Sequence, residues 1–217
     1  MIEKQVEFLF ETAQKHVFEF PKEARGRFLL YGSLIRKTTS SFNLVSKNEI
    51  ERLGRRHFLD SLSPLLFGII KPPAKLLDIG SGAGLPGIPL AIAEPGLEIS
   101  MLESVSKKAR FIDRAIKEIG LRNAEILAIR LEKLPQNPIF EYCTARAVSS
   151  IEKLLPSIYP HLKTRGKAIF FKGQNPEREI EKARIISEEI GFQNPTVFKL
   201  PDDLSPCNRT LVVYEKT

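Results

Sequence analysis

The first third of the chain carries an apolar pattern that is typical of amphipathic helices. Apolar side chains recur every three or four residues, a spacing that gathers them on one helical face. The first stripe consists of Val6, Leu9, Phe10, Ala13, Val17 and Phe20. Pro21 then stands at a predicted helix start, where its missing N–H is least costly. A second stripe runs through Phe28, Leu29 and Leu34.

The helical pattern continues to residue 73. A polar loop is predicted over residues 38–41, followed by helices over residues 49–60 and 62–70. Pro72 and Pro73 end this region, because a proline pair does not continue a helix.

Beyond residue 73, short apolar runs alternate with amphipathic stretches. The apolar runs predict buried strands, and stretches with a period near 3.6 residues predict helices. The predicted strands cover residues 75–79, 98–103, 124–129, 142–147, 167–172, 196–200 and 210–214. The predicted helices begin near Pro86 and cover residues 106–119, 149–159 and 176–190. Gly120 and Gly191 follow two of them, as glycine commonly does at a helix C-terminus.

Repeated strand–helix units indicate an α/β fold with a mostly parallel sheet and helices on both faces. The connection over residues 201–209 is too short for a crossover helix, so the last two strands should be antiparallel neighbours. We therefore expect a Rossmann-like, doubly wound, seven-stranded sheet with a C-terminal antiparallel pair, as in S-adenosylmethionine-dependent methyltransferases. The predicted domains are a helical region over residues 1–73 and the Rossmann-like domain over residues 74–217.

The chain is basic, with 217 residues and a net charge of +7. Residues 1–75 hold 13 Lys and Arg against 8 Asp and Glu, whereas residues 76–217 hold 20 against 18. This excess favours an anionic partner such as RNA. The alternative is a scattered, solvated helix face. The candidate RNA surface comprises Lys22, Arg25, Arg27, Arg36, Lys37, Lys47, Arg52, Arg55 and Arg56.

The cysteines and the hydropathy pattern bear on metal binding, on the redox compartment and on membrane association. Cys143 and Cys207 form no C-x-x-C pair and no metal-binding spacing with the three histidines, so no metal is expected. Isolated thiols fit a reducing compartment. The N-terminus shows no signal-peptide pattern, and the apolar run over residues 65–70 is too short to span a bilayer. We expect a cytoplasmic protein without a membrane partner.

A glycine-rich segment over residues 78–87 joins a predicted strand to a predicted helix. Gly80, Gly82 and Gly84 allow a sharp turn and leave room for a ligand against the backbone. The spacing of Gly82, Gly84 and Gly87 also matches the dinucleotide fingerprint, so the glycines alone do not identify the cofactor.

The register of this segment favours S-adenosylmethionine. Asp78 precedes Gly80 by two residues, and a carboxylate suits a sulfonium or ammonium group better than a pyrophosphate. Glu103, at the end of the second strand, suits ribose hydroxyls with either cofactor. Tyr159 and Lys163 have the spacing of short-chain dehydrogenases, but Pro160 would disrupt the helix that such a pair requires.

Several motifs together resemble the RsmG, or GidB, family of 16S ribosomal RNA guanine-N7 methyltransferases. The similarity spans nearly the whole chain, and the cofactor loop is its most specific part. The matching segments are residues 42–45 (FNLV), 57–62 (HFLDSL), 80–90 (GSGAGLPGIPL), 102–104 (LES), Lys107-Lys108, Arg110-Phe111, Arg146-Ala147, 171–174 (FKGQ) and 209–213.

This resemblance implies transfer of a methyl group from S-adenosylmethionine to guanine N7 in 16S ribosomal RNA or a small-subunit assembly. It also implies cofactor contacts at Gly80, Leu85, Leu131-Glu132 and Arg146, with Glu103 in the ribose role. The chain departs from the family pattern at four of its residues, which leaves the detail of the contacts at Leu131 and Glu103 open. The family often has Phe at Leu85, Asp at Glu103, a small residue at Leu131 and Ser at Ala145.

Guanine N7 carries an exposed lone pair, so its methylation releases no proton from the base and requires no general base. We assign no catalytic residue firmly. Arg146 is a candidate for holding cofactor, base or phosphate, and the alternative is a structural arginine paired with a carboxylate. Lys172 is a candidate phosphate contact or a solvated lysine.

Arg52, Arg55, Arg56, His57 and Arg209 complete the candidate RNA contacts. His57, Asp60 and Ser61 alternatively form a satisfied interface between the helical segment and the catalytic domain. We expect a monomer. Two other functions stay open: a small-molecule methyltransferase, and a non-catalytic RNA-binding module of the same fold.

Overall fold

The computed structural model describes residues 2–42, 44–204 and 209–217. Asn43 and Cys207, and the side chain of Lys47, lie outside the described part. Seven strands form one sheet in the order β3-β2-β1-β4-β5-β7-β6. They are β1 (Ala74–Ile79), β2 (Leu97–Leu102), β3 (Ala124–Leu127), β4 (Phe140–Arg146), β5 (Leu162–Lys172), β6 (Thr196–Lys199) and β7 (Thr210–Glu215).

The pairing confirms the predicted fold class. Strands β1 to β5 are parallel to one another, and β7 is antiparallel to both β5 and β6. The last two strands are therefore antiparallel neighbours, as their short connection predicted. The sequence did not show that β7 inserts between β5 and β6, because no local pattern encodes the order of strands in space.

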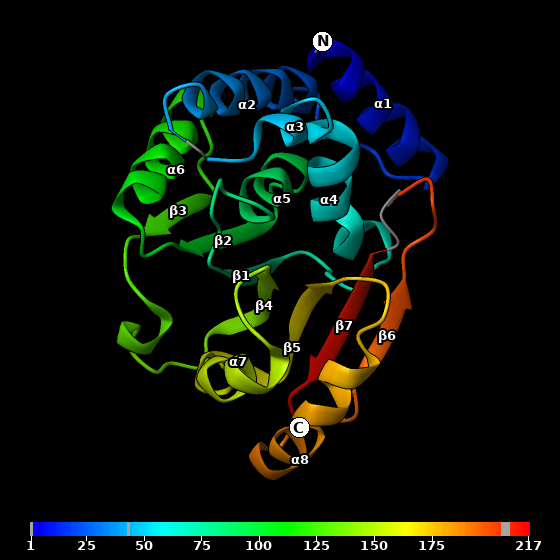
Figure 1. The fold of residues 1–217 in the computed structure, drawn as a ribbon, viewed down its shortest axis with the longest axis vertical. Coiled ribbons are helices and arrows are strands. Elements are labelled where there is room, and N and C mark those ends of the chain that lie inside the picture. The colour runs from blue at the N-terminus through cyan, green and yellow to red at the C-terminus, as the bar shows by residue number, and fades with distance from the viewer. Residues whose placement is uncertain (1, 43, 205–208) are drawn as a thin grey trace.

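Helices cover both faces of the sheet (Figure 1). One face carries α5 (Gly87–Ala93), α6 (Ser106–Ile119) and the N-terminal helices, and the other carries α7 (Ile151–Ile158) and α8 (Glu177–Ile190). Gly120 and Gly191 adopt the left-handed conformation with φ of 72° and 95°, which confirms both predicted C-caps.

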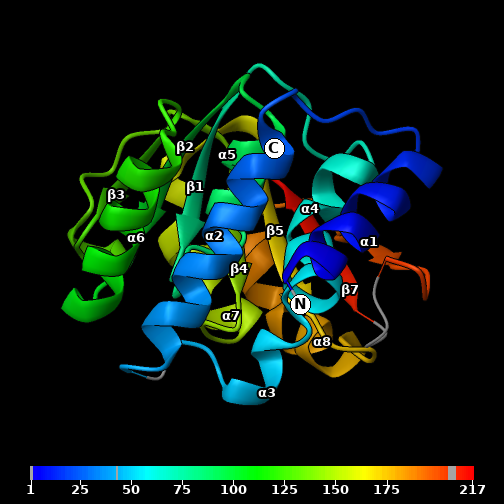
Figure 2. The same cartoon turned by 90° about the horizontal axis from the view of Figure 1, so that it is seen from above.

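The N-terminal region consists of α1 (Ile2–Lys15), α2 (Ala24–Thr39), α3 (Lys47–Ile50), the π-helix η1 (Leu53–Phe58) and α4 (Leu59–Leu66). Seen from above, α1 and α2 lie over the sheet with α6 to one side (Figure 2). One hydrophobic cluster contains Phe28 and Phe58 of this region together with Ile88, Phe111 and Ile169. The helices therefore share a core with the sheet.

Two expectations for this region were wrong. Residues 38 and 39 belong to α2 rather than to a loop. The single helix expected over residues 49–60 is divided into α3, a turn and η1, and η1 continues directly into α4. Gln5 explains the division, because its side-chain amide donates to the Ile50 carbonyl (3.1 Å) and accepts from the Gly54 N–H (2.9 Å). A contact 49 residues away is invisible to local periodicity.

Candidate functional site

Three strand ends meet at the carboxyl edge of the sheet. In the parallel register, Ile79 of β1 pairs with Leu102 of β2 and with Ala145 of β4. The next residues, Gly80, Glu103 and Arg146, therefore follow at neighbouring strand ends. Ligands of open α/β sheets bind at this edge.

The loop after β1 depends on glycine. Gly80, Gly82 and Gly84 have positive φ values of 68°, 61° and 88°, which side-chain-bearing residues rarely adopt. A Cβ on Gly80 would lie 2.6 Å from Cγ2 of Val148, whereas a Cβ on Gly82 would meet no atom closer than the Gly80 carbonyl oxygen at 3.9 Å. The loop is therefore closed behind Gly80 and open beside Gly82.

Asp78 is completely buried beneath this loop. Its Oδ2 accepts from the Gly87 N–H (3.1 Å), and its Oδ1 accepts from the Thr144 hydroxyl (3.0 Å). Burial raises the pKa of this carboxyl to about 6. The sequence predicted that Asp78 meets a cationic group, but both oxygens instead tie β1 to the start of α5 and to β4.

Glu103 stabilises the open side of the glycine loop through hydrogen bonds. Its Oε2 accepts from the Gly82 N–H (2.9 Å), and its Oε1 accepts from the Val105 N–H (2.8 Å). An ionised carboxylate has about four acceptor positions, so two more hydrogen bonds can be accepted from ribose hydroxyls. The predicted ribose residue is thus already fixed in orientation by the loop.

The other predicted cofactor residues flank these strand ends. The Leu85 N–H donates to the Ser81 carbonyl (2.8 Å) and closes the turn of the loop. Leu131 lies in a short 3₁₀ turn (Leu131–Lys133), buried in the same cluster as Ile79 and Leu102. Glu132 is exposed. An open glycine backbone, an acid for ribose and a neighbouring apolar side chain fit S-adenosylmethionine.

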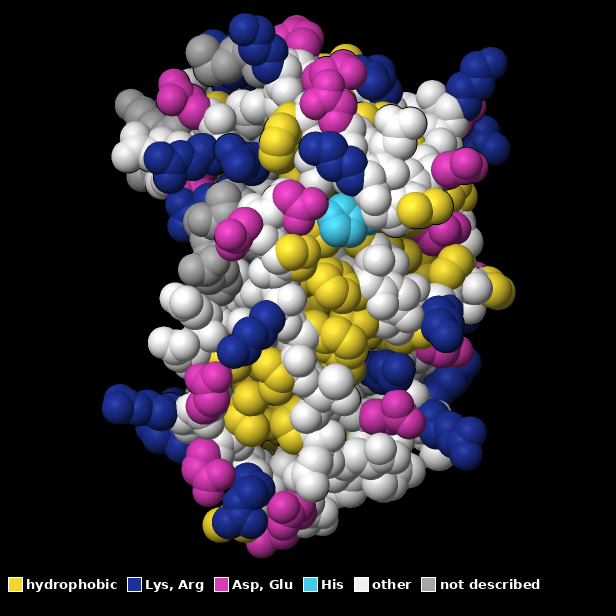
Figure 3. All heavy atoms as spheres, turned by 90° about the vertical axis from the view of Figure 1, so that its right-hand side faces the viewer, with side chains coloured by type: hydrophobic (Ala, Val, Ile, Leu, Met, Phe, Trp, Pro, Cys, Tyr) yellow, Lys and Arg dark blue, Asp and Glu magenta, His cyan; other side chains and the backbone are white. Residues whose placement is uncertain are grey.

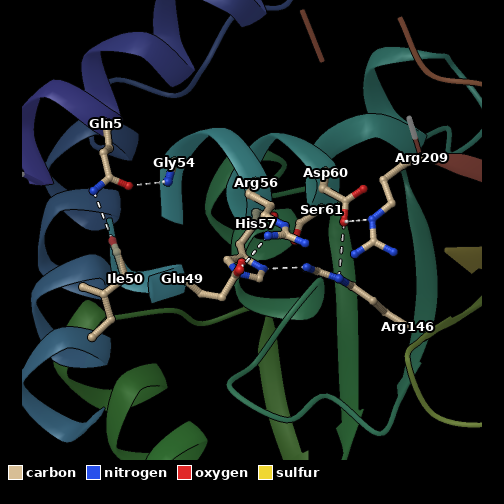
Figure 4. Close-up of polar contacts among 10 residues, drawn as sticks. All are labelled: Gln5, Glu49, Ile50, Gly54, Arg56, His57, Asp60, Ser61, Arg146 and Arg209. Atoms are coloured by element: carbon tan, nitrogen blue, oxygen red, sulfur yellow. Dashed lines mark hydrogen bonds and ion pairs between the residues drawn. The ribbon is translucent and has the colours of Figure 1, made fainter. Parts of the chain in front are cut away.

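Arg146 lies in a buried polar cluster that joins β4 to the N-terminal region (Figure 4). Its Nη2 is 2.5 Å from Nδ1 of His57, and its Nε is 3.3 Å from Oδ2 of Asp60. Asp60 also lies 4.0 Å from Nε of Arg209. The structure therefore supports an interface role for His57 and Asp60, and shows Arg146 paired with a carboxylate.

The charges of this cluster are strongly perturbed by burial. Burial and the nearby arginines Arg146, Arg56 and Arg209 lower the pKa of His57 to about 3, so the ring is neutral at physiological pH. Burial raises the pKa of Asp60 above its usual range, although the arginines oppose the shift. Arg146 Nη1 is buried and has no hydrogen-bond partner in the described part of the chain.

The structure holds Lys172 within the protein. Its Nζ donates to Oε1 of Glu179 (2.6 Å) and to the Ser149 carbonyl (3.1 Å). The same Glu179 oxygen accepts from the Ile151 N–H (2.8 Å), so this contact joins β5, α7 and α8. Lys172 is therefore neither a solvated lysine nor free to reach a phosphate in this conformation.

The predicted RNA residues of η1 and its N-terminal flank separate into two groups. Arg52 and Arg55 are exposed, and the Arg55 guanidinium lies 4.9 Å from the centre of the Phe8 ring. Arg56 instead pairs with Glu49, its Nη1 lying 2.6 Å from Oε1. Over the N-terminal helices, the face in Figure 3 carries basic and acidic side chains side by side, so the basic excess is not a uniform patch on that face.

Sequence reasoning missed three residues that shape the site. The Tyr31 hydroxyl on α2 donates to the Ala83 carbonyl of the glycine loop (2.7 Å). Glu49 lies 2.8 Å from Nε2 of His57, and Thr144 bonds Asp78. Local sequence patterns carry no signal for the contact of Tyr31, because its partner lies 52 residues away.

The dehydrogenase alternative has no support in the geometry. Tyr159 and Lys163 lie at the amino-terminal end of β5, at the edge of the sheet opposite the glycine loop. Lys163 pairs there with Glu141. Among the described residues, no helix is long and apolar enough to cross a membrane.

Solved structures with the same fold include S-adenosylmethionine-dependent methyltransferases and a protein in complex with S-adenosylmethionine. A putative enzyme of this class from Methanococcus maripaludis superposes with a TM-score of 0.62 at 16% identity, covering 85% of this chain and 94% of its own. The M. jannaschii protein TYW2, in complex with AdoMet, gives 0.60 at 20% identity and covers 82% and 78%. At these identities the likeness establishes the fold.

Sequence comparison identifies the family. The family model described as rRNA small subunit methyltransferase G (GidB) matches residues 25–201. A ribosomal RNA small subunit methyltransferase G from Carboxydothermus hydrogenoformans is 33% identical over 90% of this chain and 84% of its own. One from Lactobacillus acidophilus is 32% identical over 97% and 90%. The chain therefore belongs to the rRNA small subunit methyltransferase G family, as the motifs around its glycine loop predicted.

Proposed function

We propose that the protein transfers the methyl group of S-adenosylmethionine to N7 of a guanine in 16S ribosomal RNA, as free RNA or within a small-subunit assembly. One observation carries this proposal: in a chain of this family, Gly80, Glu103 and Arg146 converge at one edge of the sheet. We expect a monomer, and the ribosomal substrate favours a cytoplasmic location.

The cofactor would lie along the open side of the glycine loop. Gly80, Gly82, Gly84 and Leu85 form the cradle, and Glu103 would accept from the ribose hydroxyls. When bound, the cofactor supplies an electrophilic methyl group. Asp78 lies beneath the glycine loop, where its hydrogen bonds to Gly87 and Thr144 hold the loop in its conformation. Leu131 and Glu132 would border the nucleoside.

Methylation at N7 is consistent with how the acidic and basic side chains at the carboxyl edge of the sheet are hydrogen-bonded. The lone pair of N7 attacks directly and the base gives up no proton, so catalysis rests on alignment and electrostatics. The acceptor atoms of Asp78, Glu103 and His57 are all engaged by protein donors. None of the three is placed as a free general base, which an N7 target does not need.

The RNA would contact exposed arginines of the N-terminal region. Arg52 and Arg55 have their guanidinium groups at the surface, and we assign them to phosphate contacts. Arg209, the residue directly before β7, borders the same cluster as Arg146 and would face the substrate. Arg56, His57 and Lys172 are held by protein partners, and we assign them to the ordering of the site.

The decisive measurement is methyl transfer from labelled S-adenosylmethionine to small-subunit ribosomal RNA, followed by mass spectrometry of the nucleosides. Free RNA and small-subunit particles serve as parallel substrates. We expect labelled 7-methylguanosine. Label in a different nucleoside would contradict the N7 assignment. No label in either RNA, together with measured cofactor binding, would favour a small-molecule methyltransferase or a non-catalytic module.

A further inference from the structure

The contact between Arg146 and His57 fixes the protonation state of the imidazole. A guanidinium has only N–H donors, so His57 Nδ1, at 2.5 Å from Arg146 Nη2, must be the acceptor. A neutral imidazole then carries its proton on Nε2. That atom faces Oε2 of Glu49 at 2.8 Å, within ion-pair distance though without the alignment of a hydrogen bond.

The groups around the imidazole favour a proton on Nε2 and disfavour a second proton on Nδ1. Arg146, Arg56 and Arg209 oppose a positive charge on the ring, whereas Glu49, the acid next to Nε2, favours the N–H at that atom. Asp60 faces Arg146 from the next turn, but both of its oxygens lack hydrogen-bond partners among the residues that the structure describes. Arg146 is therefore held on one side by an ion pair of 3.3 Å and on the other by the shorter contact to His57.

The orientation of Arg146 matters because the residues after it shape the glycine loop. Ala147 has a φ of 55°, an uncommon value for a residue with a side chain. Val148 then packs against Gly80, close enough to exclude a Cβ there. Arg146 belongs to β4, but its guanidinium is held by His57 of η1 and Asp60 of α4, both in the N-terminal region (Figure 4).

We propose that His57 is a positioning residue: its neutral imidazole, backed by Glu49, orients the Arg146 guanidinium, so that the N-terminal region completes the methyl-transfer site. This differs from the sequence prediction of His57 as an RNA contact. The part that concerns turnover rests on the proposed function, whereas the part that concerns the tautomer does not.

The tautomer is measured on the unmodified protein by ¹⁵N NMR of labelled histidine. The chain has only three histidines, and His161→Leu removes one signal for assignment. We expect His57 to stay neutral with its proton on Nε2 from pH 8 down to pH 5. A ring that is charged at pH 7, or that carries its proton on Nδ1, would overturn the proposal.

Turnover is tested with two substitutions at the same position. His57→Leu has a similar volume and no acceptor, whereas His57→Gln keeps an acceptor for Arg146. We expect kcat to fall at least about tenfold in the Leu variant and to stay within about threefold of the original value in the Gln variant. The KM for RNA should change less than about twofold in both, because Arg52 and Arg55 remain.

His161→Leu is the matched control, since it removes a buried histidine from the far end of β5. It should leave kcat unchanged. Equal losses in the Leu and Gln variants, or a loss confined to the KM for RNA, would refute positioning through an acceptor. If the unmodified protein transfers no methyl group, the proposed function fails, and the NMR measurement alone decides the His57 contact.

Discussion

Gly82 is the position where a single side chain would most directly disturb the cofactor site. Its φ of 61° strains any L-residue, and the space beside it is open. Gly80 differs, because Val148 already fills the space where its Cβ would be. The two glycines therefore serve different purposes: Gly80 allows close packing inside the protein, and Gly82 leaves room for a ligand.

Gly82→Asp should abolish cofactor binding. The substitution combines backbone strain with a carboxylate next to Glu103, which would repel both that side chain and the methionine carboxylate. Gly82→Ala is the control, since it imposes the strain of about 1 kcal/mol without the charge. Isothermal calorimetry measures both. Unchanged affinity in the Asp variant would place the cofactor elsewhere.

His57 should make stability depend on pH. Its pKa of about 3 in the folded protein lies below the ordinary 6.5, so the unfolded chain binds the proton more readily. Its contribution is fully present above about pH 6.5 and declines toward pH 3, by at most about 1.4 kcal/mol per pH unit. Asp60 and Asp78 have raised pKa values and act in the opposite sense.

The His57 contribution is isolated by comparison with His57→Gln, which cannot titrate. Urea unfolding at pH 7.5 and pH 5 should show the free energy of unfolding falling more in the original protein than in the variant. Parallel changes in the two proteins would mean that His57 has an ordinary pKa and is not held neutral by Arg146.

Two helical elements of the N-terminal region touch the site from above the sheet. Helix α2 contacts the glycine loop through Tyr31, whose ring also stacks on Phe58 of η1 with centroids 5.4 Å apart. The π-helix η1 carries His57 to Arg146. The N-terminal helices therefore help to hold the glycine loop and the polar cluster around Arg146 in place.

Tyr31→Phe should weaken both stability and cofactor binding. It leaves the buried Ala83 carbonyl without its donor, which costs about 1–3 kcal/mol of unfolding free energy. Tyr214→Phe is a matched control, because the buried Tyr214 hydroxyl has no hydrogen-bond partner among the described residues. Its removal should cost nothing. Equal effects of the two substitutions would show that the Tyr31 contact does not support the loop.

At the scale of the whole molecule, a shared hydrophobic core joins the N-terminal region to the sheet. The N-terminal region also carries most of the net positive charge. The shared hydrophobic cluster makes independent movement of the helices costly. The basic side chains in excess among residues 1–75 are therefore fixed in position relative to the site. This arrangement suits a substrate held by its phosphates while one base enters the carboxyl edge.

RNA binding should therefore weaken steeply with salt. Each phosphate contact contributes a slope of about −0.7 to log K against log salt for a single strand. Arg52→Ala and Arg55→Ala should each reduce the magnitude of the slope by roughly that amount. Arg184→Ala on α8 is the control, because that side chain is engaged with Glu181 and Glu188. A slope unchanged in all three variants would exclude this surface.

The sequence by itself determined the fold class, most strand positions, both glycine C-caps and the family. Each of these depends on a pattern within a few residues: the 3.6-residue period of the helices, the short apolar runs of the strands, the run of glycines after β1, and the motif around His57. Local spacing was sufficient because strands, helix ends and tight turns are set by backbone geometry and by the nearest side chains.

The tertiary structure alone decided which polar side chains meet. It placed β7 between β5 and β6, divided the expected helix at Gln5, turned Asp78 inward and brought Glu49, His57 and Asp60 to Arg146. The contact between His57 and Arg146 spans 89 residues. Burial then set the protonation state of each group, and burial is a property of the packed molecule that no sequence window contains.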